Sequence, residues 1–383
     1  MSAIKGILKK LMDFVPLKNK VILESNPDMA DNTYYLYKKI LEKGYNRKYK
    51  LIWLVNNPKE FNNINIKNVY FKEWEPKNPI KKLDNRWLLY TAKYVIVCNK
   101  YIEKRRKNQT VAALGHGTIL KSVKQHKMIG KDCDFTLCPS EFFIPIYCDQ
   151  LKLNRSQLVL SGYPRNDMLS VGGSISRLLR CNEDTKYIIW MPTFRKQKNS
   201  GRVDSSFSFP LGIPIIYNVQ ELKSINKFLK KCNIVMLLKL HPAQDTSVIR
   251  ASSYSNFLIL DDAALKEHGI TLYEILSDTA ALITDYSSIY YDYLLLHKPI
   301  GITLDDYQEY KECNGFSFSN ILDILKGEYI YNIIDLERFI SNVELGNDVM
   351  REEREKVNRM ANKYQNGEYS QMVLDYLVKN KGF

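Results

Sequence analysis

The chain has 383 residues, of which 45% are hydrophobic and 26% are charged. This length and apolar content exclude an intrinsically disordered protein and predict about two packed domains. Lysine and arginine outnumber aspartate and glutamate by 56 to 42, a formal charge of +14 that favours polyanions, anionic lipids or phosphorylated substrates as partners.

The first 17 residues have the pattern of a basic amphipathic helix, with apolar residues at helical spacing and lysines between them. Two interpretations stay open, namely a helix that lies on anionic lipid and an ordinary helix packed on its own domain. We treat residues 1–18 as a separate segment and a candidate membrane contact.

From residue 19 onward, apolar runs of strand length alternate with helical patterns. Strands are predicted at 21–23, 51–55, 94–98, 111–114, 135–137 and 158–160, with helices such as 32–43 and 141–151 between them. This alternation predicts a first α/β domain, residues 19–175, with a doubly wound and mostly parallel sheet.

A glycine-rich interruption at 172–174 and a polar stretch at 181–186 separate this series from a second one. Strands are predicted at 187–191, 234–240, 257–260, 281–283 and 300–303, with helices at 219–231, 272–277 and 289–296. They predict a second α/β domain, residues 176–336, in which 199–214 is a long loop near the site. Closing helices at 349–364 and 369–377 complete residues 337–383. Two Rossmann-like domains facing a cleft are typical of nucleotide-dependent transferases.

The seven cysteines form no CxxC pair and have no histidine partner at a zinc-like spacing, so we interpret them as reduced thiols. No cofactor is required by the sequence, and Mg²⁺ is compatible with it but not indicated. No apolar run approaches the roughly 18 residues of a membrane-spanning helix, and no signal peptide is recognisable. A cytoplasmic location is therefore expected.

Two histidines directly follow predicted strands, at the edge where open α/β sheets bind their ligands. His116 lies between two glycines, where it could accept the proton of an attacking hydroxyl or merely satisfy a loop carbonyl. His241 precedes a proline that ends its strand, where it could donate a hydrogen bond to a phosphoryl oxygen or have a structural role.

A third polar stretch, Thr284-Asp285-Tyr286-Ser287-Ser288, lies between a predicted strand and a predicted helix. Serine hydroxyls and free helix N–H groups bind phosphate oxygens at such a place, although an ordinary helix cap is the alternative. We expect Asp285 to orient the turn or a serine. Arg165 and Arg195 also follow strands and could bind a diphosphate or form surface ion pairs.

Other chemistries find less support in the sequence. There is no GxxxxGK[ST] loop, no GxGxxG after a strand, no GxSxG elbow and no HExxH motif. Asp305 and Asp306 could bind a metal but are interpreted as a solvated loop pair. The basic run 104–107 lacks the aromatic interleaving of a nucleic-acid surface, so no nucleic acid is expected as a partner.

Five motifs in order resemble the CDP-glycerol glycerophosphotransferase family, the bacterial enzymes that build teichoic acids and related capsule polymers. These motifs are His116-Gly117-Thr118, Gly162-Tyr163-Pro164-Arg165-Asn166-Asp167, Pro192-Thr193-Phe194-Arg195, Leu240-His241-Pro242 and Ile283-Thr284-Asp285-Tyr286-Ser287-Ser288. The similarity extends from about Lys20 to the C-terminus.

The resemblance implies a two-domain fold of the glycosyltransferase-B type, with the CDP-polyol bound mainly to the C-terminal domain. It implies attack of an acceptor hydroxyl on the polyol-bearing phosphorus of CDP-glycerol, with release of CMP. His116 resembles the proposed general base and His241 the histidine that stabilises the diphosphate. The residues that correspond to substrate-binding positions are Gly117, Thr118, Arg165, Thr193, Arg195, Asp285, Ser287 and Ser288.

The acceptor that the resemblance implies is a lipid-linked cell-wall or capsule precursor, which would bring the enzyme to the anionic inner face of the cell membrane. Gly115 and Ile119 replace the Trp and Pro that often flank this histidine motif, so contacts with the acceptor could differ. CDP-ribitol is a close donor variant. Two alternatives remain, a nucleotide-sugar glycosyltransferase of similar fold and a non-catalytic polyanion-binding protein.

Overall fold

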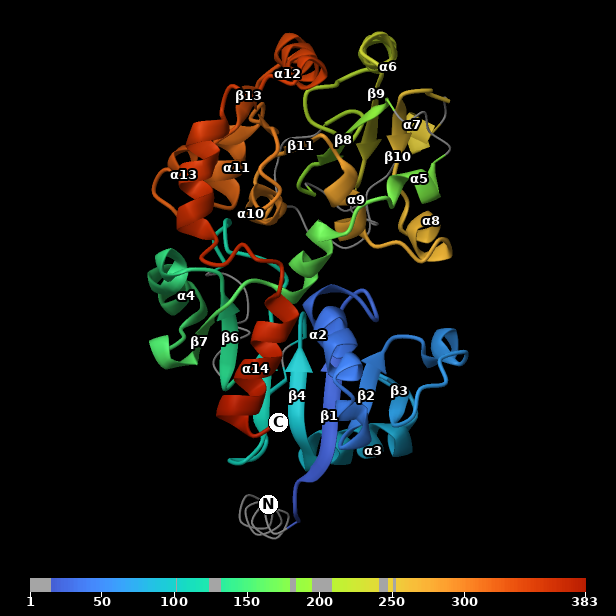
Figure 1. Ribbon diagram of the computed structural model, residues 1–383, viewed down its shortest axis with the longest axis vertical. Helices are drawn as coiled ribbons and strands as arrows, with labels where there is room; N and C mark the ends of the chain where they lie inside the picture. Colours follow the sequence, from blue (N-terminus) through green and yellow to red (C-terminus); the bar gives the residue numbers. More distant parts are fainter. Residues whose placement is uncertain are drawn as a thin grey trace. The chain divides into compact units, whose positions relative to one another are not determined.

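The computed structural model describes residues 15–100, 102–123, 132–179, 184–194, 209–240, 247–250 and 253–383, and these divide into two compact α/β units (Figure 1). Unit 1 contains the described residues up to His116, those from Asp132 to Asp167, and those from Glu368 to the C-terminus. Unit 2 contains residues 117–123 and the described residues from Met168 to Gly367.

Unit 1 is built on a seven-stranded sheet in which every neighbouring pair of strands is parallel. The strand order is β3-β2-β1-β4-β5-β6-β7. The strands are β1 (Lys18–Glu24), β2 (Lys50–Val55), β3 (Val69–Glu73), β4 (Ala92–Val97), β5 (Thr110–Ala113), β6 (Phe135–Cys138) and β7 (Leu158–Leu160). The central strands are buried apolar runs, as a sheet covered on both faces requires.

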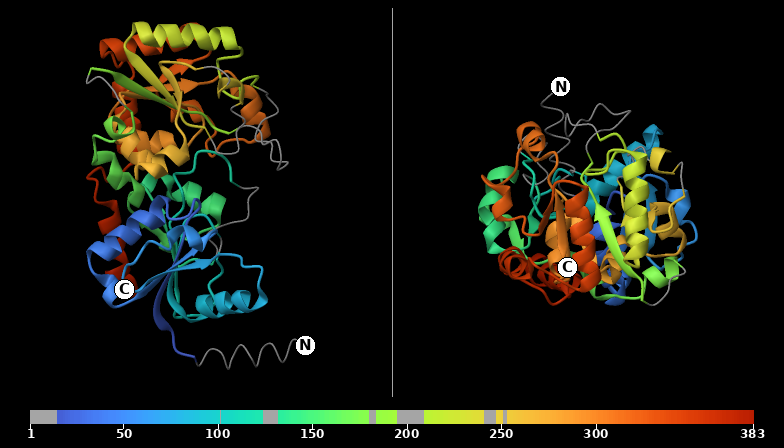
Figure 2. Two further views of the ribbon diagram at one scale, coloured as in Figure 1. Left: turned by 90° about the vertical axis from the view of Figure 1, so that its right-hand side faces the viewer. Right: turned by 90° about the horizontal axis from the view of Figure 1, so that it is seen from above.

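Helices cover both faces of this sheet (Figure 2). The helices α2 (Asp31–Glu42) and α14 (Tyr369–Lys381) contribute Leu36, Ile40, Val373, Leu374 and Leu377 to one buried cluster with the strands. The helix α3 (Pro79–Thr91) lies against β1 and β4, and α4 (Ile144–Leu151) precedes β7. The last helix of the chain therefore completes the core of the first unit.

Unit 2 has a six-stranded parallel sheet of order β10-β9-β8-β11-β12-β13. The strands are β8 (Lys186–Met191), β9 (Ile234–Leu238), β10 (Phe257–Ile259), β11 (Ala281–Thr284), β12 (Ile300–Thr303) and β13 (Glu328–Ile330). The helices α6 (Val219–Lys231) and α12 (Ile333–Leu345) pack their apolar faces into the core of this unit.

The remaining helices of unit 2 are shorter or lie further along the chain. They are α5 (Ile175–Leu178), α7 (Ser247–Arg250), α8 (Asp262–Glu267), α9 (Leu272–Asp278), α10 (Ile289–Leu294), α11 (Tyr307–Cys313) and α13 (Arg351–Ala361). The helix α10 packs against β11 and α13. It thereby fixes the turn that carries the polar stretch after β11.

The predicted fold class, α/β with Rossmann-like units, is confirmed, and each predicted strand corresponds to an observed one. The sequence pattern does not reveal the short edge strands β3 and β13, nor several helices, among them α3 and α12. Of the predicted loop 199–214, only residues 209–214 are described, and they belong to no helix or strand. Of the predicted N-terminal helix, residues 1–14 lie outside the described residues, residues 15–17 belong to no helix or strand, and Lys18 begins β1. In the described parts of the chain, no helix has the length and apolar character needed to span a bilayer.

Candidate functional site

His116 lies in a tight loop directly after β5, at the carboxyl edge of the unit 1 sheet. The flanking glycines have backbone φ angles of +69° at Gly115 and +135° at Gly117. A side chain is strained at such angles, so glycine at both positions lets the chain turn sharply on either side of the histidine.

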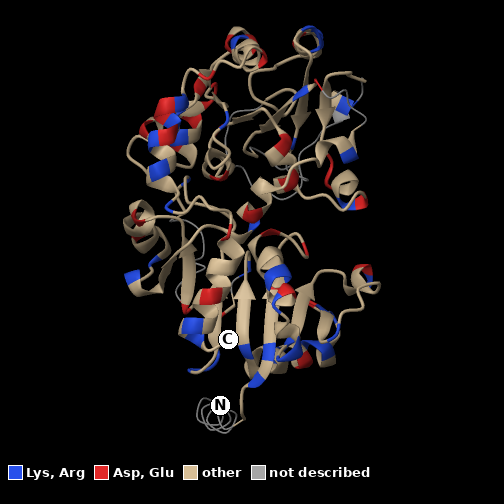
Figure 3. Ribbon diagram, in the orientation of Figure 1, with Lys and Arg blue, Asp and Glu red and all other residues tan. Residues whose placement is uncertain are grey.

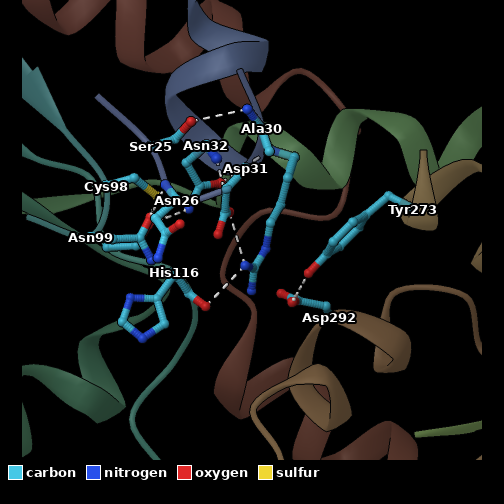
Figure 4. A network of polar contacts seen from close by, with 12 residues as sticks. Ser25, Asn26, Ala30, Asp31, Asn32, Cys98, Asn99, His116, Tyr273 and Asp292 are labelled. Atoms are coloured by element: carbon cyan, nitrogen blue, oxygen red, sulfur yellow. Dashed lines mark hydrogen bonds and ion pairs between the residues drawn. The ribbon is translucent and has the colours of Figure 1, made fainter. Parts of the chain in front are cut away.

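Two successive carbonyl groups of this loop are held by side chains from distant parts of the chain (Figure 4). The Gly115 carbonyl accepts hydrogen bonds from Asn32 Nδ2 at 2.7 Å and from Cys98 Sγ at 2.8 Å. The His116 carbonyl accepts one from Arg165 Nη1 at 2.9 Å. Because both carbonyls are fixed, the backbone that carries the imidazole has little freedom.

Arg165 is almost completely buried, with 7% of its side chain exposed. Its Nη1 also binds Asp31 Oδ1 at 2.9 Å, and its backbone N–H donates to Asn32 Oδ1 at 3.2 Å. The structure therefore brings Arg165 to the His116 loop, where its ion pair with Asp31 is buried and not at the surface. The predicted contact of Arg165 with a substrate phosphate stays a prediction.

Glu24, at the end of β1, supports the loop that follows β4. Its Oε2 accepts hydrogen bonds from the backbone N–H groups of Cys98, Asn99 and Lys100 at 3.2, 3.1 and 3.0 Å. Burial raises the pKa of this carboxyl group, while the three N–H groups lower it. Glu24 thus holds the loop from which Cys98 reaches Gly115.

The electrostatic surroundings of His116 favour the neutral imidazole. Neighbouring protein atoms desolvate the ring and lower its pKa, although part of the residue is exposed to solvent. The cation of Arg165 also lowers this pKa, whereas Asp31 and a hydrogen bond with the Cys98 backbone raise it. A neutral imidazole is the form that can accept a proton.

The residues that follow His116 belong to unit 2. Thr118 is 2% exposed, and its hydroxyl oxygen is buried with no hydrogen-bond partner among the residues that the structure describes. Further on, Lys121 forms an antiparallel bridge with Phe316, and Ser317 donates to the carbonyls of Leu120 and Lys121 at 3.0 and 2.8 Å. This pairing anchors the segment after His116 in unit 2.

At the carboxyl edge of the unit 2 sheet, Asp285 joins the loops that follow β8 and β11. Both of its carboxylate oxygens accept the backbone N–H of Thr193, each at 2.9 Å. Thr284 Oγ1 donates to the Met191 carbonyl at 2.8 Å. Asp285 thus holds the backbone of the neighbouring Thr193 loop, and the expected effect on its own turn or on a serine stays a prediction.

Ser287 and Ser288 are partly exposed at the start of α10, and the Ser288 side chain makes no capping hydrogen bond. Between them and Asp285, Tyr286 is fully buried, and its ring lies 4.4 Å from that of Tyr310 and 5.2 Å from that of Phe316. The buried tyrosine fixes the turn, so the two serines that follow it occupy set positions.

Two predicted site residues, His241 and Arg195, lie outside the described residues.

The interpretation of Asp305 and Asp306 as a solvated pair is wrong. Asp306 is completely buried, and Asp305 Oδ2 accepts hydrogen bonds from Ile215 N and Tyr217 OH at 2.7 and 2.8 Å. Across the described ranges, no group of three or more His, Cys, Asp or Glu side chains is arranged to hold a metal ion.

The sequence pattern does not mark the residues that support the His116 loop, namely Glu24, Asp31, Asn32 and Cys98. Asn32 and Gly115 are 83 positions apart, and Arg165 and Asp31 are 134 apart. The one available signal was the polar stretch directly after the first strand, at the same sheet edge as His116.

Comparison with known sequences places these motifs in context. The family model described as CDP-Glycerol:Poly(glycerophosphate) glycerophosphotransferase matches residues 7–379. A teichoic acid poly(glycerol phosphate) polymerase of Bacillus spizizenii is 25% identical over 346 residues, which cover 81% of this chain and 80% of that protein. The teichoic acid ribitol-phosphate polymerase TarL of Staphylococcus aureus is 24% identical over 310 residues, 75% of this chain but only 50% of TarL.

Solved structures share the fold. The wall teichoic acid polymerase TagF superimposes with a TM-score of 0.74 at 20% identity, covering 99% of this chain and 96% of that chain. The UDP-GlcNAc 2-epimerase from Neisseria meningitidis gives a TM-score of 0.55 at 12% identity, covering 94% and 99% of the two chains. At these identities the likeness shows the fold alone.

Proposed function

Because the chain belongs to the CDP-glycerol:poly(glycerophosphate) glycerophosphotransferase family, we propose that it transfers glycerol phosphate from CDP-glycerol to a hydroxyl group of a lipid-linked teichoic acid or capsule precursor. The family match across residues 7–379 carries this proposal. In the reaction, the acceptor oxygen forms a bond to the glycerol-bearing phosphorus, the bond from that phosphorus to the bridging oxygen breaks, and CMP leaves.

We assign the role of general base to His116. A ring nitrogen would accept the proton of the acceptor hydroxyl as its oxygen attacks phosphorus. The lowered pKa supports this role because it keeps the imidazole neutral at a lower pH. The hydrogen bonds from Asn32, Cys98 and Arg165 to the loop support it as well, since proton transfer depends on the position of the base.

We assign the donor phosphates to unit 2. Ser287 and Ser288 would donate hydrogen bonds to phosphate oxygens, and both residues are partly exposed. Asp285 would act indirectly by holding the Thr193 backbone. His241 and Arg195, on which the structure is silent, are proposed to bind the diphosphate. Phosphoryl transfer depends mainly on such positioning and charge stabilisation.

A lipid-linked acceptor would require the protein to work at the membrane surface. We therefore propose peripheral association with the anionic inner face of the cell membrane. The positive net charge and the basic amphipathic pattern of the first 17 residues support this proposal. Gly117 and Thr118, directly after the base, are proposed to contact the acceptor or the donor.

The donor is tested by incubating the protein with CDP-glycerol and synthetic lipid-linked acceptors, then measuring CMP release and the mass of the products. CDP-glycerol should release CMP and add one glycerol phosphate or more to the acceptor. CDP-ribitol belongs in the same assay, because relatives include ribitol-phosphate polymerases. Release of a nucleoside diphosphate from UDP-sugars, without CMP from either CDP-polyol, would overturn the proposal.

The base is tested by replacing His116 with alanine. Loss of a general base should lower kcat by about 10²- to 10⁴-fold while leaving CDP-glycerol binding nearly unchanged. His297→Ala is the matched control, because its imidazole is exposed and contacts Glu355 at 2.7 Å in unit 2. Near-normal turnover by the His116 variant would sink the assignment, and calorimetric titration with CDP-glycerol would show whether donor binding survives.

A further inference from the structure

The helix α3 differs from the other helices of unit 1 because large apolar side chains cover its solvent-facing side. Ile80, Leu83 and Trp87 are 78%, 67% and 39% exposed. Their spacing of three and four residues places them on one face of the helix, which we term the α3 outer face. Soluble monomers seldom expose such a run of apolar side chains without a partner.

This exposure does not arise from a loosely attached helix. The Asn78 side chain caps the first turn by accepting the N–H groups of Ile80 and Lys81 at 2.8 and 3.3 Å, and Pro79 opens the helix. On the inner side, Leu88 is 4% exposed and Asn85 Nδ2 donates to the Glu73 carbonyl at 2.7 Å. The helix is therefore fixed with its apolar residues pointing outward.

The surroundings of this face are basic. Lys81, Lys82 and Arg86 are exposed on α3, and its single acidic residue, Asp84, is paired with Lys72. Figure 3 shows further blue segments where β1 and β2 begin, beside α3. There, burial and the charges of Lys18, Lys50 and Lys72 lower the pKa of Lys20. An apolar face among cations is complementary to a surface that is both apolar and anionic.

The segment that precedes β1 ends close to the α3 outer face. Arg106 Nη1 donates to the Val15 carbonyl, and the guanidinium group lies 5.1 Å from the centroid of the Tyr90 ring in α3. Tyr90 in turn stacks on Trp87, with ring centroids 6.4 Å apart. The end of the predicted amphipathic segment is thus fixed beside the α3 outer face.

We propose that the α3 outer face is a contact surface for an anionic lipid bilayer, in which Ile80, Leu83 and Trp87 enter the interfacial layer and the basic side chains of α3 bind phospholipid head groups. Tryptophan is suited to this layer because its ring is apolar and its N–H is polar. A second copy of the chain is a poorer occupant, because the cations of two such faces would repel each other. The proposal extends the membrane association proposed above and does not depend on the transfer reaction.

The test compares the full-length protein with the variant Ile80→Ser/Leu83→Ser/Trp87→Ser in cosedimentation with vesicles. Vesicles of equal parts phosphatidylglycerol and phosphatidylcholine should bind the unchanged protein, and phosphatidylcholine alone should bind it much less. The variant should partition at least about tenfold more weakly, because three interfacial side chains are lost. Ile334→Ser/Leu345→Ser is the matched control, because these apolar residues of α12 are 75% and 69% exposed.

A second measurement locates the contact. Brominated phosphatidylglycerol should quench the fluorescence of Trp87. Trp53 and Trp190 are completely buried, and the partly buried Trp74 is replaced by phenylalanine in both proteins of this comparison. Trp87→Phe keeps the face apolar and should bind vesicles nearly as well, but most of the quenching should disappear. Equal quenching in this variant would place the contact elsewhere and overturn the proposal.

The remaining outcomes are also decisive. Unchanged vesicle binding by the triple-serine variant, or an equal loss in the α12 control, would refute the proposal. So would light scattering that shows a dimer for the unchanged protein and a monomer for the triple-serine variant, because the face would then join two copies. Transfer to a water-soluble acceptor should persist in this variant, which separates a failure of membrane contact from a failure of the proposed catalytic function.

Discussion

Asp31 and Arg165 act on His116 with opposite charge. Asp31 lies in the left-handed region of backbone conformation, with φ at +56°, where aspartate is tolerated better than most residues. Its carboxylate receives the guanidinium group that also holds the His116 carbonyl. One ion pair thus links a strained turn to the loop of the proposed base.

This arrangement predicts pH profiles that shift in opposite directions. Desolvation by neighbouring protein atoms, the largest influence on the pKa of His116, stays in both variants, but Asp31→Asn removes a charge that raises this pKa and Arg165→Gln removes one that lowers it. Because the base works in its neutral form, activity falls as the pH drops through its pKa. The acidic limb of kcat/KM should therefore move to lower pH in Asp31→Asn and to higher pH in Arg165→Gln.

The two profiles are measured with CDP-glycerol as the varied substrate. A role limited to folding would lower activity at every pH and leave the limb in place. Movement of both limbs in the same direction would show that the charges do not act on the base in the proposed way. Asn32→Ser provides a comparison, because it changes the support of Gly115 without changing any charge.

At the scale of single residues, the proposed catalytic histidine could be predicted from the sequence, whereas the residues that hold its loop in place could not. His116 was predictable because glycines and a preceding strand mark it locally. Asn32 and Cys98 have no local mark, since their partner Gly115 is reached only when the parallel strands bring their carboxyl ends together. The burial of Asp306 likewise depends on neighbours that a loop pattern does not reveal.

At the scale of elements, the buried strands were predictable because they are apolar runs of the right length. The strands β3 and β13 lie at sheet edges, and β13 has three residues, so neither gives a strong pattern. The helix α3 was missed for a different reason. Its apolar residues lie on both its inner and outer sides, so no single buried stripe marks it as an amphipathic helix.

The docking of α14 on unit 1 depends on close backbone approach. Asp167 accepts the N–H groups of Tyr369 and Ser370 at 2.7 and 3.1 Å, which fixes the start of the helix. A Cβ atom at Gly162 would lie 2.1 Å from the Tyr369 ring. Glycine is therefore needed at position 162 for packing, and this glycine opens the motif that carries Arg165.

Gly162→Ala should consequently destabilise the protein by about 1–3 kcal/mol, because the ring or the strand end must shift to make room. Urea unfolding followed by circular dichroism measures this change. Gly172→Ala is the matched control: its added Cβ would meet only Asp278 Oδ1, at 3.4 Å, so its effect should stay within about 0.5 kcal/mol. Equal stability of both variants would show that Tyr369 does not need this close approach.

At the scale of the whole molecule, each unit has a hydrophobic core of its own. The unit 1 core unites strands from the first half of the chain with Val373, Leu374 and Leu377 from its end. The unit 2 core contains residues of β8, β9, β10, β11 and β13 together with α6 and α12, and the two clusters have no residue in common. The core of unit 1 is thus completed by the last helix of the chain, which follows the segment that forms unit 2.

Separate cores predict that destabilisation remains local. Leu374→Ala in unit 1 and Ile340→Ala in unit 2 each remove a side chain that is at most 1% exposed, at a cost of about 2–5 kcal/mol. In hydrogen exchange followed by mass spectrometry, Leu374→Ala should accelerate exchange in peptides from β1 and β2 and leave β8 and β9 unchanged, and Ile340→Ala should do the reverse. The double variant should show both effects with little interaction, because the sites share no partner. If either single variant accelerated exchange equally in both units, the chain would unfold as one cooperative body and the two cores would not be independent.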